Sequence, residues 1–157
     1  MIMSKVDKYV VLIPRIQSVL SGETDEIARM SNMAALLHFE FGFWWTGFYR
    51  VVSSDELVLG PFQGPVACTR IRKGRGVCGT SWKEERTLVV PDVEQFSGHI
   101  ACSSESRSEI VVPCWKCGRI VAVLDIDSKE LATFDEVDKD YLEQIVSMLY
   151  GEECHME

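Results

Sequence analysis

A cysteine and three carboxylates between residues 98 and 127 could carry out thiol and acid chemistry together. Cys102 lies in a small polar loop, and Glu109, Asp125 and Asp127 follow on or beside two strongly apolar strands. Because alternate side chains of a strand share a face, Asp125 and Asp127 are predicted to point the same way, and the apolar residues beside them the other way. Two acids on one face repel each other, which costs stability and raises their pKa values. The pattern indicates either a functional acid pocket or, as the alternative, two solvated carboxylates at a strand end.

Three cysteines lie in or beside loops rather than inside apolar runs, namely Cys68, Cys78 and Cys102. A cysteine used as a small hydrophobic residue would more often lie in an apolar run, so reactivity is one interpretation of each, and a buried structural thiol is the other. Cys78 is predicted near a helix N-terminus, where the helix dipole would stabilise its thiolate. His99 could steer the Cys102 thiolate, although a lone histidine is more often structural.

The remaining cysteines suggest other kinds of site. Cys114 and Cys117 form a Cys-x-x-Cys pair, which taken alone favours a thioredoxin-type or zinc site. The pair falls in a predicted hairpin turn rather than at a helix start, and neither a second such pair nor paired histidines complete a zinc site. We therefore expect no metal and no cofactor, and we interpret Cys154 as incidental. The basic run 70–75 could hold an anion, but a solvated turn is the simpler interpretation.

Composition restricts the class of protein. The 157 residues are 46% hydrophobic and 25% charged, which predicts one globular domain spanning residues 1–157. The net charge of -8 argues against a partner with a phosphate backbone, so no nucleic acid is expected. No apolar run reaches the length of a membrane span and no secretory signal is evident, so we expect no membrane association and a cytoplasmic location. Because that compartment keeps thiols reduced, six cysteines are not expected to form a stapling framework.

The pattern of apolar residues predicts the elements that position these side chains. A first helix over 6–20 should be kinked or reset by Pro14, and a second is capped by Thr24 and buries a stripe that begins at Ile27. A capping box over 133–136 starts the last helix. Strands are predicted within 39–52, 57–59, 67–71, 87–90, 110–112 and 120–126, with a short helix over 77–85 and a long loop over 93–108. This order predicts an α+β fold, an α/β sandwich in which helices pack on a mainly antiparallel six-stranded sheet.

Ordered blocks along the whole chain resemble one known family, the free methionine-R-sulfoxide reductases, which are single-domain enzymes of the GAF fold. The blocks are 45–49 (WTGFY), 59–64 (LGPFQG), 67–71 (ACTRI), 74–79 (GRGVCG), 90–93 (VPDV), 98–102 (GHIAC), 108–113 (SEIVVP) and 124–128 (LDIDS). The resemblance runs from the first helix to the last. One block alone would be weak, but the ordered set is specific.

The resemblance implies reduction of free L-methionine (R)-S-oxide to methionine without a cofactor, recycling by thioredoxin, and a homodimer. Carried over by position, Cys102 is the nucleophile, Cys68 is the resolving cysteine and Cys78 is an auxiliary third cysteine. The substrate is held by three acids, Glu109, Asp125 and Asp127, and Trp45 forms the aromatic wall for its methyl group. The sequence departs from the family at 103–105, where Ser-Ser-Glu replaces an expected aspartate. Cys114, Cys117 and Cys154 are also outside the family pattern.

The residue types suit this chemistry on their own. Attack of a thiolate on a sulfoxide sulfur needs a proton for the oxygen, which a carboxylic acid kept neutral by burial and by neighbouring acids can supply. The resulting sulfenic acid condenses with a nearby thiol to form a disulfide. Two alternatives remain open: a GAF sensor that binds a small molecule without turnover, and a thiol redox sensor or zinc protein that uses the same cysteines.

Overall fold

The computed structural model describes residues 2–98, 105–151 and 154. Its elements in chain order are α1 (Lys5–Leu20), α2 (Glu26–Phe41), β1 (Trp45–Val51), β2 (Glu56–Gln63), β3 (Arg70–Arg72), α3 (Gly76–Glu84), β4 (Leu88–Val90), the 3-10 turn η1 (Val93–Gln95), β5 (Ser108–Lys116), β6 (Arg119–Ser128) and α4 (Glu136–Val146). The predicted order of helices and strands is confirmed.

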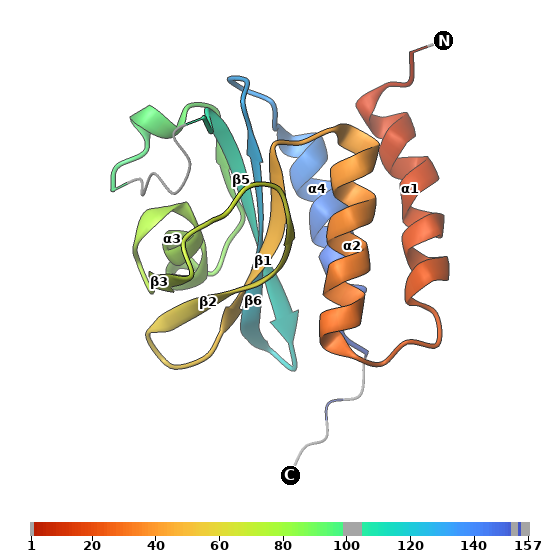
Figure 1. Cartoon of the computed structure of the whole chain (residues 1–157), viewed down its shortest axis with the longest axis horizontal. Helices are drawn as coiled ribbons and strands as arrows, with labels where there is room; N and C mark the ends of the chain where they lie inside the picture. The colour runs from red at the N-terminus through yellow and green to blue at the C-terminus, as the bar shows by residue number, and fades with distance from the viewer. Residues whose placement is uncertain (1, 99–104, 152–153, 155–157) are drawn as a thin grey trace.

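The strands form one six-stranded sheet in the order β3-β2-β1-β6-β5-β4, and every neighbouring pair is antiparallel. Helices α2 and α4 cover one face with α1 packed outside them, and α3 with the loops around it covers the other face (Figure 1). The predicted α+β sandwich is therefore confirmed. No helix in the described ranges is long and apolar enough to cross a membrane.

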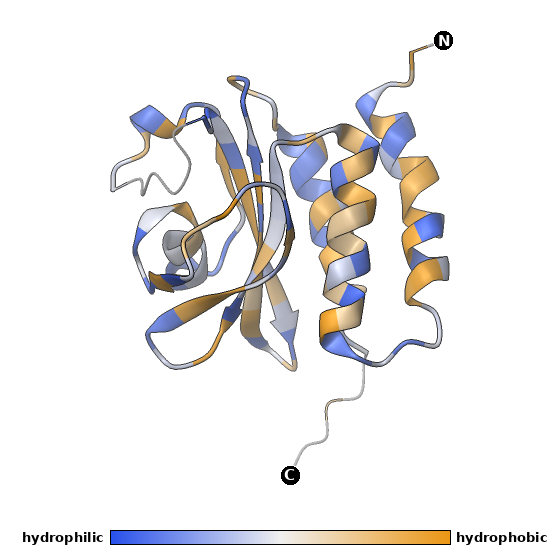
Figure 2. Cartoon of the chain, viewed as in Figure 1, coloured by the Kyte–Doolittle hydropathy of each residue, from blue (hydrophilic) through white to orange (hydrophobic). Residues whose placement is uncertain are grey.

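Two apolar clusters hold these layers together, one on each face of the sheet. The first joins α1, α2 and α4 to inward residues of the central strands, including Phe48, Leu124 and Ile126. The second lies under α3 and includes Trp45 and Tyr49. Apolar and polar residues alternate along α1 and α2 (Figure 2), as in helices that bury only one side.

The helix boundaries differ from the sequence-based expectations in three places. Helix α1 continues through Pro14 without a reset, because the proline ring lies on the exposed side while neighbouring residues pack in the core. The N-cap of α2 is Asp25, whose carboxylate accepts from the Ala28 amide at 2.9 Å, and Ile27 is largely exposed. The capping box at the start of α4 is formed by Asp135 and Asp138, two residues later than the predicted box over 133–136.

The aromatic segment 39–52 is not a single strand. Its first residues complete α2, which ends at Gly42 with a left-handed φ of 69°, and the strand begins only at Trp45. Glycine adopts this conformation without steric cost, so Gly42 was the available sequence signal for the helix end. Aromatic density alone did not distinguish the helix end from the strand.

The cysteines outside the family pattern are placed differently from the prediction. Cys114 is a buried free thiol within β5, while Cys117 lies in the β5–β6 turn and forms a disulfide with Cys154, with a Cα–Cα distance of 5.4 Å. The interpretation of Cys154 as incidental is wrong in this structure, although Cys78 and Cys114 remain free thiols. Thirty-seven positions separate the two residues, so sequence spacing gave no signal for the pair.

Candidate active site

The three acids predicted from the sequence lie side by side on the sheet face that carries α3. Antiparallel pairing sets Glu109 opposite Asp127 and Val111 opposite Asp125, so the acids of β5 and β6 share a face. Residues Leu124 and Ile126 point into the opposite cluster, as strand alternation predicted. This confirms the shared face. Asp125 is buried and Asp127 is half-buried, which argues against the alternative of two solvated carboxylates.

Burial and mutual repulsion raise the pKa values of carboxyl groups in this acid cluster. The pKa of Glu109 is well above its ordinary value because the carboxyl is buried and lies beside Asp125 and Asp127. Burial and the charge of Asp125 likewise raise the pKa of Asp127. The Ser106 hydroxyl donates a hydrogen bond of 3.2 Å to Asp127, which favours its ionised form and opposes part of that rise. The raised pKa values of Glu109 and Asp127 favour the protonated form of these carboxyl groups.

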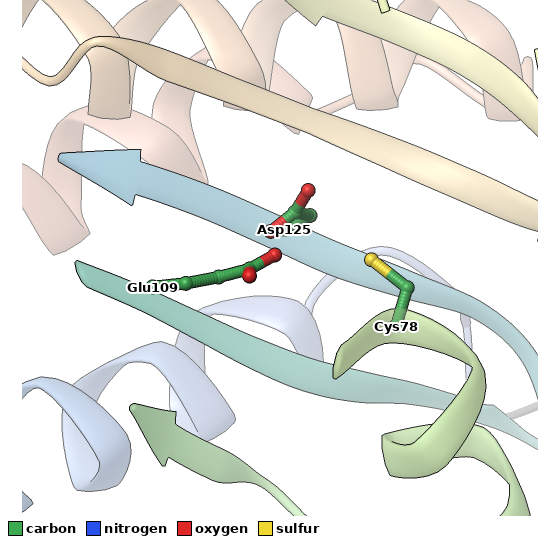
Figure 3. A group of neighbouring side chains, drawn as sticks. All are labelled: Cys78, Glu109 and Asp125. Carbon is green, nitrogen blue, oxygen red and sulfur yellow. The ribbon is translucent and has the colours of Figure 1, made fainter. Parts of the chain in front are cut away.

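The Cys78 thiol completes this cluster from helix α3. Its sulfur and one oxygen each of Glu109 and Asp125 lie within 4.8 Å of one another, and all three residues are buried (Figure 3). The pKa of Cys78 is well above its ordinary value, first because the thiol is buried and then because it faces Asp125 and Glu109. The predicted thiolate at the helix N-terminus is therefore wrong: desolvation and adjacent acids outweigh the helix dipole.

An aromatic wall stands beside the acids. The Trp45 ring stacks on Phe62, with centroids 5.2 Å apart, and its indole N–H donates to the carbonyl of Pro65 at 3.0 Å. The Tyr49 hydroxyl donates to the carbonyl of Cys68 at 2.9 Å, which ties the loop that carries this cysteine to the sheet. Burial raises the pKa of Tyr49, so its hydroxyl remains a donor.

These groups line a pocket between α3 and the sheet, with a cavity volume of about 50 Å³. The structure brings five predicted site residues into its lining, namely Trp45, Cys78, Glu109, Asp125 and Asp127. Cys68 lies next to the lining residue Ala67 and takes part in a disulfide. The predicted nucleophile Cys102, and His99 with it, lie outside the described residues.

Three lining residues with polar side chains were not predicted as site residues: Tyr49, Arg75 and Ser106. Tyr49 follows Trp45 by four positions in the same strand, so alternation could have placed the two on one face. Arg75 belongs to the basic run that the sequence favoured as a solvated turn, and it is the N-cap residue of α3. Ser106 offered no sequence signal beyond its place between the long loop and β5.

Comparison with known proteins agrees with this architecture. The GAF domain model matches residues 15–150. The chain is 58% identical to GAF domain-containing protein A of Dictyostelium discoideum, over 93% of this chain and 92% of that protein. It is 43% identical to the free methionine-R-sulfoxide reductase of Escherichia coli (strain K12), over 94% of this chain and 89% of the relative.

A solved structure gives the same result. The free methionine-R-sulfoxide reductase from Neisseria meningitidis, solved in complex with its substrate, is 53% identical and superposes with a TM-score of 0.92, covering 95% of this chain and 90% of that one. The sequence matches and the superposition extend over nearly the whole chain, including the strands that carry the acid cluster. This chain therefore belongs to the GAF domain family and, within it, to the free methionine-R-sulfoxide reductases.

Proposed function

We propose that this chain reduces free L-methionine (R)-S-oxide to L-methionine by thiol chemistry in the pocket between α3 and the sheet. The observation that carries the proposal is the cluster of the buried Glu109 and Asp125 with the half-buried Asp127, in which desolvation and repulsion raise the pKa values of Glu109 and Asp127. Such a cluster supplies protons to an oxygen atom, and it attracts the ammonium group of a free amino acid. The neighbouring aromatic wall gives the methyl group an apolar surface.

The reaction divides into three balanced steps. The Cys102 thiol attacks the sulfoxide sulfur, the oxygen is transferred to the cysteine with proton donation from Glu109 or Asp127, and methionine and a Cys102 sulfenic acid result. The Cys68 thiol then condenses with the sulfenic acid, which forms a disulfide and releases water. A dithiol reductant finally reduces this disulfide by thiol–disulfide exchange, which restores both thiols and leaves the reductant oxidised to a disulfide.

The assignments of Cys102, Cys68 and Cys78 are part of this proposal. Support for Cys68 comes from its engagement in a disulfide and from the Tyr49 hydrogen bond that holds its carbonyl near the pocket. Cys78 is buried with a raised pKa, so it is a poor nucleophile and serves as an auxiliary thiol. Trp45 is proposed as the wall for the substrate methyl group.

We propose thioredoxin as the reductant, a homodimer as the assembly, and the cytoplasm as the location of a chain that works as one GAF domain. A thioredoxin-dependent cycle requires a reducing compartment, which supports the location. In that compartment the exposed Cys117–Cys154 pair would be open for part of the time. The homodimer rests on the family resemblance alone.

The test is a coupled assay in which NADPH consumption is followed with thioredoxin, thioredoxin reductase and each diastereomer of free methionine sulfoxide. Turnover of the R form only is expected. Binding of the R form without turnover would instead support a sensor and refute the proposal.

Single-turnover measurements separate the roles of the two cysteines. Cys102→Ser should abolish the first methionine formed, whereas Cys68→Ser should still allow one turnover and recycling by dithiothreitol. Equal loss of the first turnover in both variants would overturn the assignment of nucleophile and resolving cysteine.

A further inference from the structure

The Cys117–Cys154 disulfide lies far from the pocket that carries the proposed reaction. Cys117 follows directly after β5, and Glu109 lies near the opposite end of that nine-residue strand. Because a strand rises about 3.3 Å per residue, the two residues are about 25 Å apart. Both cysteines of the pair are exposed. The disulfide is therefore accessible to a soluble thiol and is separate from the acid cluster.

The chain between α4 and this disulfide is held against α2 by non-covalent contacts. The Arg29 guanidinium donates to the carbonyl of Met148 at 2.5 Å and to that of Leu149 at 2.9 Å. The Tyr150 hydroxyl donates to the Glu26 carboxylate at 2.8 Å. These contacts hold the segment 147–151 on the N-terminal half of α2, and the disulfide joins the chain beyond it to the β5–β6 turn.

The segment 147–151 covers the buried free thiol of Cys114. Cys114 is fully buried in the same apolar cluster as Leu149, and Tyr150 packs against that cluster. The pKa of Tyr150 is raised by burial, by its hydrogen bond to Glu26 and by the neighbouring Cys114, so the phenol and the thiol lie close together. Release of this segment would therefore expose Cys114 to solvent.

We propose that Cys117 and Cys154 form a second redox couple, separate from the proposed catalytic thiols, which controls access to Cys114 by fastening or releasing the C-terminal segment. A dithiol opens the couple by transferring two electrons and two protons to it, so that both cysteines become thiols and the dithiol becomes a disulfide. A small disulfide such as oxidised glutathione closes the couple in two exchanges and leaves as two thiols. The couple needs no sulfoxide substrate, so it is independent of the proposed reductase function.

The redox state of the couple is measured after the unmodified protein has been equilibrated with a graded series of ratios of reduced to oxidised glutathione. Free thiols are blocked with iodoacetamide, and trypsin, which cleaves after Lys116, separates Cys114 from Cys117 for mass spectrometry. The Cys117–Cys154 link should disappear within this series, and at the same ratio in Cys68→Ser, because Cys68 is not part of the couple. The proposal is overturned if the link survives excess dithiothreitol, never forms with oxidised glutathione, or opens at a different ratio in Cys68→Ser.

Access to Cys114 is measured by its rate of labelling with iodoacetamide in the folded protein. The rate should be about 10-fold or more higher in the reduced protein and in Cys154→Ser than in the oxidised protein, because the released segment opens locally. Local opening exposes little surface, so this rate should depend weakly on urea, whereas labelling through global unfolding rises steeply with urea. Equal rates in the oxidised and reduced proteins, or a urea dependence as steep as that of global unfolding, would overturn the proposal.

Tyr150→Phe is the matched control, because it removes the hydrogen bond to Glu26 and keeps both cysteines of the couple. With the couple closed, labelling of Cys114 in this variant should stay as slow as in the oxidised unmodified protein. With the couple open, labelling should be faster than in the reduced unmodified protein. Fast labelling in oxidised Tyr150→Phe would mean that the non-covalent contacts control access to Cys114, and the proposal would then be wrong.

Discussion

Replacing Glu109 by glutamine should stabilise the fold at alkaline pH while it damages the proposed reaction. The Glu109 carboxyl is buried, and one of its oxygens lies within 4.8 Å of an oxygen of Asp125. Two unit charges at 4.8 Å repel by about 3.5 kcal/mol at an effective dielectric constant of about 20. Glutamine keeps nearly the same shape but carries no charge, so this repulsion is absent in the variant.

The sign of the pH dependence follows from the raised pKa of Glu109. Above the ordinary pKa of a glutamate the unfolded chain loses this proton while the folded chain retains it, so the stability of the unmodified protein falls as pH rises toward the raised pKa. Below the ordinary pKa of a glutamate both the folded and the unfolded chain carry the proton, so Glu109 does not lower the stability of the folded protein there. The advantage of Glu109→Gln should therefore grow from near zero at pH 4 to about 3.5 kcal/mol in alkaline solution.

Urea unfolding at a series of pH values measures this difference. Glu94→Gln is a suitable control, because Glu94 is an exposed glutamate of η1 and its replacement should leave the pH dependence unchanged. In the coupled assay, Glu109→Gln should slow the reaction by about 10²- to 10⁴-fold, as expected for loss of a general acid. The claim that Glu109 and Asp125 repel each other would be refuted if the variant were less stable than the unmodified protein at alkaline pH. It would also be refuted if the free energies of unfolding of the two proteins changed equally with pH.

Two further predictions concern stability and the aromatic wall. Cys154→Ser should lower the free energy of unfolding by up to about 4 kcal/mol, the chain-entropy value for a loop closed by Cys117 and Cys154 across 37 positions. Urea unfolding under oxidising conditions checks this, and a variant as stable as the oxidised parent would contradict it. Gly47→Ala would place a Cβ atom against the Cβ of Phe62 on β2 and 2.7 Å from the Trp45 ring, so both Phe62 and the ring must shift and KM for the sulfoxide should rise. Gly151→Ala, which meets nothing within 4 Å, is the control for that assay, and an unchanged KM in Gly47→Ala would show that the ring does not hold the substrate.

Local patterns predicted much of the fold. Alternation along β6 predicted that Asp125 and Asp127 share a face, and helical spacing predicted the positions of α1, α2 and α4. The predicted helix boundaries were less accurate where two sequence signals favoured different structures. Gly42 ended α2 inside an aromatic segment, and the packing of α1 overrode Pro14.

The electrostatic state of the site could not be predicted from the chain alone. The sequence placed Cys78 at a helix N-terminus, and on that local ground a lowered pKa was expected. In the folded protein the thiol is buried against Glu109 and Asp125, which come from β5 and β6, and its pKa is raised instead. Desolvation and long-range approach of charges exist only after the layers have packed.

The sequence by itself determined which residue types are present, the faces on which β6 presents its acids, and the family to which the chain belongs, because these depend on spacing along the chain. Tertiary structure alone decided that α3 brings Cys78 and Arg75 to the pocket of acids, and that Cys117 pairs with Cys154 rather than with its near neighbour Cys114. These outcomes depend on distances between segments far apart in sequence, and packing of the two layers against the sheet sets those distances.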